Sequence, residues 1–179
     1  GSGFTLLFEA LAMTLMTAMP VAAAARLVGE HDTRMWRVLH HWVEQARARA
    51  DYADVSRVCI DETAAKRGHD YVSLFVDIDQ RRVVFVTEGR GADTVREFAD
   101  DLEAHNGDAS RVKQVCIDMS AAFIKGVTDN LTEAEITFDK FHAVKLVNDA
   151  VDKVRRAESK GRPELRRSRY LWLRNEPSL

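Results

Sequence analysis

The sequence predicts an α/β protein in which a mixed five-stranded sheet follows a helical N-terminal segment. Apolar residues recur at helical spacing over residues 4–49, whereas from residue 55 onward short runs rich in β-branched residues alternate with amphipathic segments. Two of these runs close on the same four letters, Val-Cys-Ile-Asp, at 58–61 and 115–118. With 179 residues, 46% of them hydrophobic, the chain can build one good core and a small accessory unit.

The N-terminal segment predicts three helices. Pro20 separates the first helix from a short Ala-rich second one, which Gly29 ends. The third helix is amphipathic and carries Arg34 and Arg37 away from its apolar face. A short helix, a turn containing Gly and a second helix with basic residues are typical of a helix-turn-helix; the alternative is a helical cap packed on the next domain. These helices are expected at 4–18, 21–28 and 34–49.

The rest of the chain predicts a sheet with helical crossovers. Three strands separated by short turns suggest an antiparallel meander, and two later strands follow helices, which suggests parallel pairing. This order matches the ribonuclease H-like arrangement, in which the first and fourth strands lie side by side, although other mixed α/β sheets share it. Strands are expected at 55–63, 69–78, 82–87, 112–119 and 135–139, with helices at 93–105, 120–131 and 141–159 and a basic helical stretch at 162–174.

Each Val-Cys-Ile-Asp run places a carboxylate at the C-terminal end of a buried strand. In open α/β sheets this is the edge where ligands bind, so we expect Asp61 and Asp118 to meet there. Two carboxylates from separate strands can share a divalent cation. The alternative is that both aspartates cap the following turn or helix. Glu62 should point to the opposite face of its strand, which favours a structural role.

The charge distribution suggests which ligands the chain could bind, and the cysteines and tryptophans are expected to be structural. Residues 55–139 carry 10 Lys/Arg and 17 Asp/Glu, whereas residues 140–179 carry 11 and 5. An acidic middle suits metal binding and a basic end suits a polyanion, with solvated faces as the alternative for both. Cys59 and Cys116 are expected to be reduced core thiols, and Trp36, Trp42 and Trp172 to be core residues.

The apolar N-terminal stretch does not predict a membrane segment. Glu9, Pro20 and Arg26 interrupt residues 4–28, which leaves no span of the length that a membrane helix needs. A signal peptide would begin with basic residues, and the first one here is Arg26. We therefore expect a cytosolic protein.

Distinctive motifs recur along nearly the whole chain, and with them it resembles the ISL3 family of bacterial insertion-sequence transposases. The Ile-Asp-Glu and Phe-His-Ala-Val-Lys stretches are the most specific of them. The matching stretches are Phe4-Thr5 with Phe8-Glu9, Met19-Pro20-Val21, Ile60-Asp61-Glu62, Gly68-His69-Asp70-Tyr71, Gly89-Arg90-Gly91, Ile117-Asp118-Met119, Phe138-Asp139-Lys140-Phe141-His142-Ala143-Val144-Lys145, Asn148-Asp149-Ala150-Val151-Asp152, Val154-Arg155-Arg156 and Tyr170-Leu171-Trp172-Leu173-Arg174-Asn175.

The resemblance implies a DDE-type transposase with a ribonuclease H-like core and Mg2+-dependent DNA cleavage and strand transfer at insertion-sequence ends. Asp61 and Asp118 would be the catalytic metal ligands, with Mn2+ able to substitute for Mg2+. Asp139 and His142 would support the metal ligands from outside or contact DNA, with a helix cap as the alternative. The partners would be terminal inverted repeats and target DNA, and the working unit a homodimer or larger, because two ends must be paired.

The resemblance also implies a division of the chain. We expect a helix-turn-helix-like DNA-binding segment at 4–52, an incomplete ribonuclease H-like core at 53–160, and the basic helical start of an insertion region at 161–179. The third carboxylate of the family, a glutamate, and its N-terminal zinc segment have no counterpart in this sequence. We therefore expect the chain to be inactive alone. The alternatives are a truncated DNA-binding repressor of transposition and, third, a nuclease of the same fold.

Basic residues in three places are expected to contact DNA phosphates, since Lys and Arg that neutralise phosphates release counterions. The alternative for each place is a solvated face or turn. The candidates are Arg34 and Arg37 in the third helix, Lys66 and Arg67 after the first strand, and Lys153, Arg155, Arg156, Arg166 and Arg167 near the C-terminus.

Overall fold

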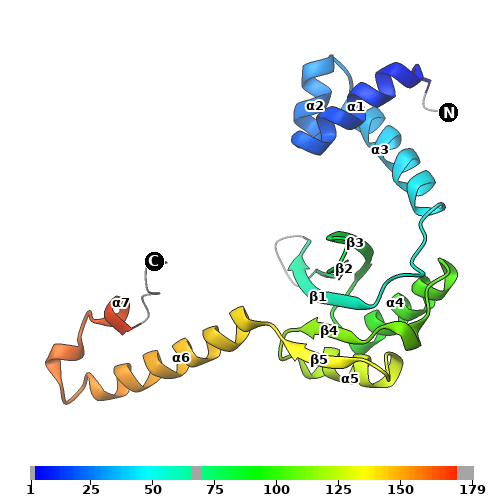
Figure 1. Cartoon of the computed structure of the whole chain (residues 1–179). Helices are drawn as coiled ribbons and strands as arrows, with labels where there is room; N and C mark the ends of the chain where they lie inside the picture. Colours follow the sequence, from blue (N-terminus) through cyan, green and yellow to red (C-terminus); the bar gives the residue numbers. More distant parts are fainter. Residues whose placement is uncertain (1–2, 66–69, 173–179) are drawn as a thin grey trace. The chain divides into compact units, whose positions relative to one another are not determined.

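The computed structural model describes residues 3–65 and 70–172, and the chain forms two compact units, residues 1–51 and 52–179. Figure 1 shows that the first unit is helical and that the second contains a sheet with helices. Lys66 and Arg67 of the predicted DNA contacts lie outside the described residues. None of the described helices is long and apolar enough to cross a membrane.

The first unit contains α1 (Leu6–Ala18), α2 (Val21–Val28) and α3 (Asp32–Arg47). Thr5 caps α1 by accepting a hydrogen bond from the backbone N–H of Phe8 at 3.3 Å. Gly29 ends α2 with a φ of 70°, a left-handed conformation that favours glycine. Small side chains let the three helices approach closely, and their buried core consists of Ala12, Ala24, Ala25 and Met35.

A polar contact ties the first helix to the third. Trp42 Nε1 donates to Glu9 Oε2 at 2.8 Å, and Glu9 is 5% exposed although it is charged. The prediction that Trp36 is a core residue is wrong, because 46% of it is exposed on α3. The helical period explains this, since Met35 and Val38 occupy the inward positions and leave Trp36 on the outer face.

The described residues of the second unit form a five-stranded sheet in the order β3-β2-β1-β4-β5. The pairs β1–β2 and β2–β3 are antiparallel, whereas β1–β4 and β4–β5 are parallel. This confirms the predicted fold class, a mixed sheet of the ribonuclease H-like kind preceded by a helical region. The strands are β1 (Arg57–Ala64), β2 (Tyr71–Asp77), β3 (Arg82–Glu88), β4 (Gln114–Ile117) and β5 (Glu135–Phe138).

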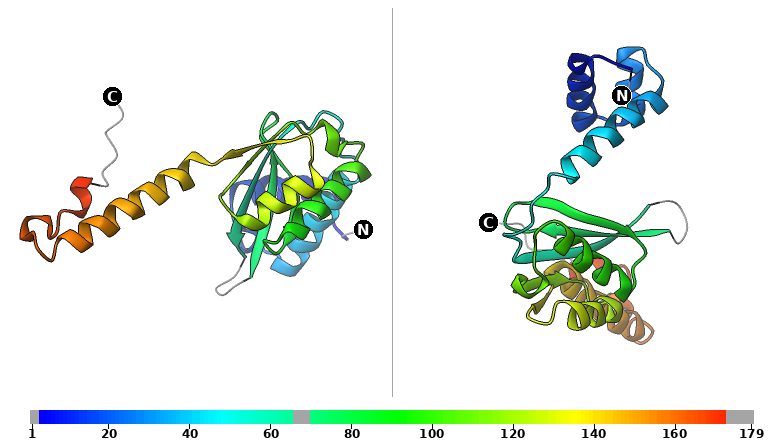
Figure 2. Two further views of the ribbon diagram at one scale, coloured as in Figure 1. Left: turned by 90° about the horizontal axis from the view of Figure 1, so that it is seen from below. Right: turned by 90° about the vertical axis from the view of Figure 1, so that its right-hand side faces the viewer.

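Helices α4 (Ala92–Ala104) and α5 (Ala121–Asn130) lie together against one face of this sheet (Figure 2). The aromatic ring of Phe98 on α4 stacks on that of Phe75 on β2, with 4.5 Å between the centroids. Both phenylalanines are fully buried. Gly126 lets α5 approach α4 closely, because a Cβ at that position would lie 2.8 Å from Cγ2 of Val95. The sheet core therefore lies between this face and the two helices.

After β5 the chain continues into α6 (Lys140–Glu158), the short turn η2 (Pro163–Leu165) and α7 (Arg169–Trp172). A short turn η1 (Ala109–Arg111) precedes β4. The stretch 162–174 was expected to be helical throughout, but within its described part only η2 and α7 are helical. Trp172 is 56% exposed, so its assignment to a core is also wrong.

Candidate functional site

Asp61 and Asp118 lie at matching positions on neighbouring parallel strands. Cys59 of β1 pairs with Cys116 of β4, and each aspartate follows two residues further toward the C-terminal end. One oxygen of each carboxylate accepts a local backbone N–H: Asp61 Oδ1 from Glu62 and Asp118 Oδ1 from Ser120, both at 2.8 Å. Each carboxylate is thereby oriented at the edge that the sequence predicted.

A third carboxylate ends the next strand. Phe138 of β5 pairs with Ile117 of β4, and the backbone N–H of Asp139 donates to the Ile117 carbonyl at 2.8 Å. Asp139 caps α6, with Oδ1 accepting from Phe141 N at 2.9 Å and Oδ2 lying 2.9 Å from Nδ1 of His142. The Phe141 N–H and then His142 lower the pKa of Asp139. Three adjacent parallel strands thus each have an aspartate toward their C-terminal end: Asp61 within β1, and Asp118 and Asp139 directly after β4 and β5.

The two cysteines lie directly behind this edge. Burial, the neighbouring Cys116 thiol and the carboxylates of Asp61 and Asp139 raise the pKa of Cys59 to about 11. Burial is also the main cause that raises the pKa of Cys116. Both residues are half-buried rather than core residues. A thiol with a raised pKa stays protonated at neutral pH and is a poor nucleophile, which fits the expected reduced state.

The donor chemistry of Asp61 and Asp118 fits a hard divalent cation, because both offer carboxylate oxygens from separate strands. The number of donors is smaller than a complete site needs. Within residues 3–65 and 70–172, no group of three or more His, Cys, Asp or Glu side chains could hold a metal ion together. Asp61 and Asp118 would therefore supply part of the coordination shell, and water or substrate oxygens the rest.

Glu62 and Arg90 form an ion pair that the sequence did not predict. Asp61 is exposed, whereas the half-buried Glu62 alternates to the other side of β1. Its Oε1 lies 3.9 Å from Nη1 of Arg90, in the turn before α4. The signal in the sequence is an arginine between two glycines, Gly89-Arg90-Gly91, directly after a strand.

The predicted DNA contacts in the first unit have different surroundings. Arg37 is exposed on α3. Arg34 pairs with Glu30 through a 2.7 Å contact between Nη1 and Oε2, and its guanidinium lies 4.2 Å from the ring centroid of Phe4. Arg34 is therefore already partly engaged within the unit, whereas Arg37 presents its charge to solvent.

The basic C-terminal residues also differ from one another. Arg155 is 13% exposed, and it donates through Nε and Nη2 to Asp152 and through Nη1 to the carbonyl of Leu165. Arg156 shares Asp152 at 2.7 Å but is 68% exposed. Arg155 thus fixes the turn after α6, while the other predicted contacts of this region, Lys153, Arg156, Arg166 and Arg167, are exposed.

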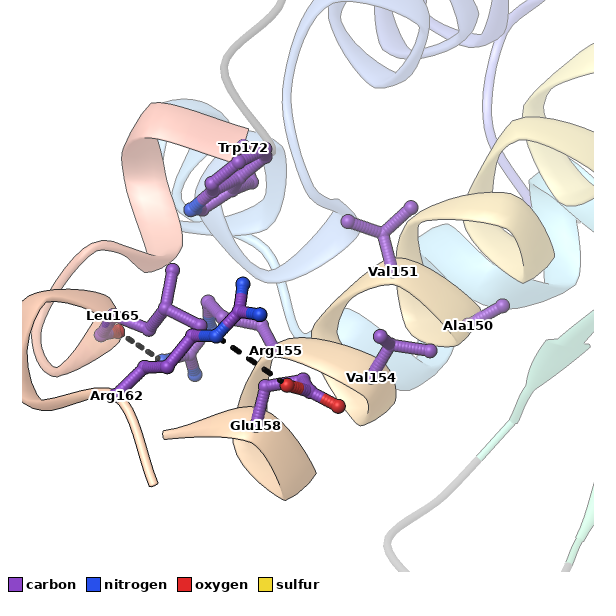
Figure 3. Close-up of a pocket in the computed structure, with 8 residues that line it drawn as sticks. All are labelled: Ala150, Val151, Val154, Arg155, Glu158, Arg162, Leu165 and Trp172. Atoms are coloured by element: carbon purple, nitrogen blue, oxygen red, sulfur yellow. Dashed lines mark hydrogen bonds and ion pairs between the residues drawn. The ribbon is translucent and has the colours of Figure 1, made fainter. Parts of the chain in front are cut away.

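An apolar cavity of about 410 Å3 lies beside this arginine cluster, between α6, η2 and α7 (Figure 3). Val151 and Val154 of α6 line it from one side and Trp172 of α7 from another, and its polar groups are paired, as in the 3.8 Å contact of Arg162 with Glu158. It is not part of the aspartate edge, and its lining offers packing rather than chemistry.

Family models match both units of the chain. Residues 58–179 match the family model described as a transposase of the DDE type, family ISL3. Residues 1–43 match the helix-turn-helix domain of transposase family ISL3, which confirms the predicted DNA-binding motif over α1, α2 and most of α3.

Two similar proteins are transposases of insertion sequence elements. The chain is 33% identical over 180 residues to the transposase for insertion sequence element IS1001 of Bordetella parapertussis, covering 92% of this chain and 42% of that protein. It is 28% identical over 164 residues to the IS1557 transposase of Mycobacterium tuberculosis, covering 89% and 36%. Among solved structures, the simian T-cell lymphotropic virus intasome in complex with PP2A regulatory subunit B56 gamma aligns with a TM-score of 0.36 at 15% identity, over 90% of this chain and 66% of that one.

The chain spans less than half the length of these two transposases. The family match covers most of the second unit and the motif match most of the first, so both units are assigned independently. On these grounds the chain belongs to the ISL3 family of DDE transposases.

Proposed function

We propose that this chain carries the DNA-recognition helices and two of the metal-binding carboxylates of a transposase that cuts and joins DNA at insertion-sequence ends. The observation that carries the proposal is the matching position of Asp61 and Asp118 on parallel strands β1 and β4, in a chain of this family. In the whole protein these two aspartates would bind Mg2+, and Mn2+ would substitute for it.

In this reaction the protein would form no covalent bond to DNA and would act by positioning the reacting groups. A bound divalent cation supplies activation of the attacking water or 3′-hydroxyl and stabilisation of the leaving oxygen. The residues of the chain orient the groups around it, since the N–H groups of Glu62 and Ser120 fix the Asp61 and Asp118 carboxylates. Asp139 holds the imidazole of His142 through Nδ1, which leaves Nε2 to donate or accept a proton at a DNA oxygen.

DNA would be held by both units. The outer face of α3, which carries Arg37, would enter the major groove of a terminal inverted repeat. The exposed residues Lys153 and Arg156 of α6, and Arg166 and Arg167 after it, would bind phosphates of the repeat or of target DNA. The whole protein would act as a homodimer or larger assembly on the bacterial nucleoid, because two element ends must be brought together.

A Mn2+ titration followed by NMR tests the metal-binding part of this proposal. Paramagnetic broadening should centre on Asp61 and Asp118 and should disappear in Asp118→Asn. The matched control is Asp129→Asn, which removes an exposed carboxylate at the end of α5 and should leave the broadening in place. Broadening that is spread over the acidic surface, or that is equal in the two variants, would contradict the assignment.

A second candidate function is DNA binding without catalysis, as a repressor that occupies element ends. The absence of a three-donor metal group within the described residues favours it for this chain taken alone. Nicking of supercoiled plasmid in the presence of Mn2+ separates the two. Nicking that is lost in Asp61→Asn supports the enzyme, whereas salt-dependent DNA binding with no nicking supports the repressor.

A further inference from the structure

Arg90 sits on a turn that the fold holds rigidly at the end of β3. Gly89 has a φ of 99°, and its N–H donates to the Tyr71 carbonyl of β2 at 2.8 Å. The hydroxyl of Ser73, which is fully buried, donates to the Gly89 carbonyl at 2.8 Å. A buried hydroxyl and a backbone pair thus fix the position from which the Arg90 side chain leaves the sheet.

The neighbours of Arg90 orient its guanidinium but leave most of its N–H donors without a partner among them. It lies 4.4 Å from the ring centroid of Tyr71, within cation–π range. Its contact with Glu62 is long, at 3.9 Å, and the Arg90 side chain is 56% exposed. A guanidinium has five N–H donors in a planar fork, so one long ion pair leaves most of them available to a ligand. An exposed pair of this kind contributes little to stability.

The place of Arg90 relates it to the aspartate edge. Its partner Glu62 directly follows Asp61, and consecutive Cα atoms are about 3.8 Å apart. The guanidinium therefore lies on the order of 10 Å from the backbone of Asp61. Arg90 thus lies at the edge of the sheet that also carries Asp61, on the opposite side of β1 from the Asp61 carboxylate.

We propose that Arg90 binds a backbone phosphate of DNA that is held at the edge of the sheet where Asp61 and Asp118 lie. This inference rests on the proposed function. Tyr71 and Glu62 are positioning residues: the ring carries the flat face of the guanidinium, and the carboxylate sets its rotation until a phosphate competes for the same donors. The competing explanation is that Arg90 only neutralises Glu62.

Fluorescence anisotropy of the full chain with a short fluorescein-labelled duplex, repeated over a salt series, tests the proposal. Arg90→Gln should weaken binding by about tenfold, as expected for a lost hydrogen bond to a charged group. It should also reduce the magnitude of the slope of log K against log salt by about 0.9, because one phosphate contact, and the counterion release that accompanies it, is lost. Arg90→Lys should keep the slope but bind a few-fold more weakly, because it keeps the charge and loses the fork.

The matched control is Arg96→Gln, which removes the same charge from an exposed position on α4 and should leave affinity and slope as in the unmodified chain. Glu62→Gln adds a cycle: it should strengthen binding more in the presence of Arg90 than in the Arg90→Gln background. A purely structural Arg90 would lower the thermal midpoint in Arg90→Lys without changing the salt slope in Arg90→Gln.

The outcomes separate this inference from the function on which it rests. Equal effects of Arg90→Gln and Arg96→Gln, or an unchanged salt slope in Arg90→Gln, would overturn the role of Arg90 while DNA binding by the chain stands. An unmodified chain that shows no salt-dependent binding of the duplex would overturn both.

Discussion

Asp139 and His142 form a pair at the junction of β5 and α6, with His142 Nδ1 2.9 Å from Asp139 Oδ2. The same carboxylate caps α6 through the Phe141 N–H. One side chain therefore orients an imidazole and begins a helix, at the edge of the sheet where Asp61 and Asp118 lie. Its two contacts make different and separable contributions to the pKa of Asp139.

His142→Ala should raise the pKa of Asp139 only part of the way to its ordinary value. The Phe141 N–H is the largest cause of the lowered pKa and remains in the variant, while the His142 contact is lost. Carboxyl-carbon NMR titration measures this pKa directly. Asp152 is the internal control, because its lowered pKa depends on Arg155 and should not move. A pKa of Asp139 that stays unchanged would mean that the imidazole contact does not form in solution.

The same carboxylate predicts a pH dependence of stability. A carboxyl whose folded pKa is lowered stabilises the fold above its unfolded pKa, about 3.9, and loses that contribution as the pH falls through the folded value. Asp139→Asn should therefore flatten the acid side of the stability profile below about pH 4 and change little at neutral pH beyond a constant loss. Urea unfolding at a series of pH values checks this, with Asp129→Asn as the comparison.

Gly126→Ala should destabilise the second unit. The added Cβ would lie 2.8 Å from Val95 Cγ2 and 2.9 Å from the Ala92 carbonyl, both on α4, so the two helices would have to separate. Overpacking of this kind costs about 1–3 kcal/mol. Gly161→Ala is the control, since a Cβ there meets nothing within 4 Å. Thermal unfolding should show a lower midpoint only for Gly126→Ala; equal midpoints would mean that α5 can shift without cost.

Asp152→Ala should loosen the segment after α6. Asp152 is 5% exposed and holds Arg155 and Arg156, and Arg155 in turn donates to the Leu165 carbonyl. Without the carboxylate, Arg155 loses the charge that compensates its burial. Hydrogen exchange should accelerate over η2 and α7 and stay unchanged in α1–α3. Asp149→Ala, an exposed position on the same helix, should show no such change.

The sheet was predictable because its signals are local and repeated. Both Val-Cys-Ile-Asp runs contain β-branched residues and form strands. A strand reached by a helical crossover pairs in parallel, which places Asp61 and Asp118 side by side. The helix-turn-helix was predictable from Gly29 and the amphipathic α3 for the same reason. Turn residues and hydrophobic period decide these features within a few residues of the chain.

The direction in which long side chains turn was not predictable, since it depends on distant partners. Arg155 and Arg156 are neighbours in one basic run, yet Asp152 and the Leu165 carbonyl draw Arg155 inward and leave Arg156 exposed. The orientation of the Arg90 side chain was not predictable, because Tyr71 and Glu62, which orient it, lie on other strands. Trp36 looked like a core residue because hydrophobicity alone does not say which face of α3 it occupies.

Trp36→Ala should weaken DNA binding while it leaves the first unit folded. The indole is 46% exposed on the outer face of α3, with its ring 5.9 Å from that of His40 one turn further along. Exposed aromatic groups on a recognition helix can contact thymine methyl groups in the major groove. The loss should be larger on a duplex from the element's ends than on an unrelated duplex, because apolar base contacts carry specificity and phosphate contacts do not.

Trp42→Phe is the matched control, since it removes the donor to the buried Glu9 carboxylate and should lower the thermal midpoint instead. Equal affinity of Trp36→Ala and the unmodified chain for both duplexes would exclude this face of α3 from DNA recognition.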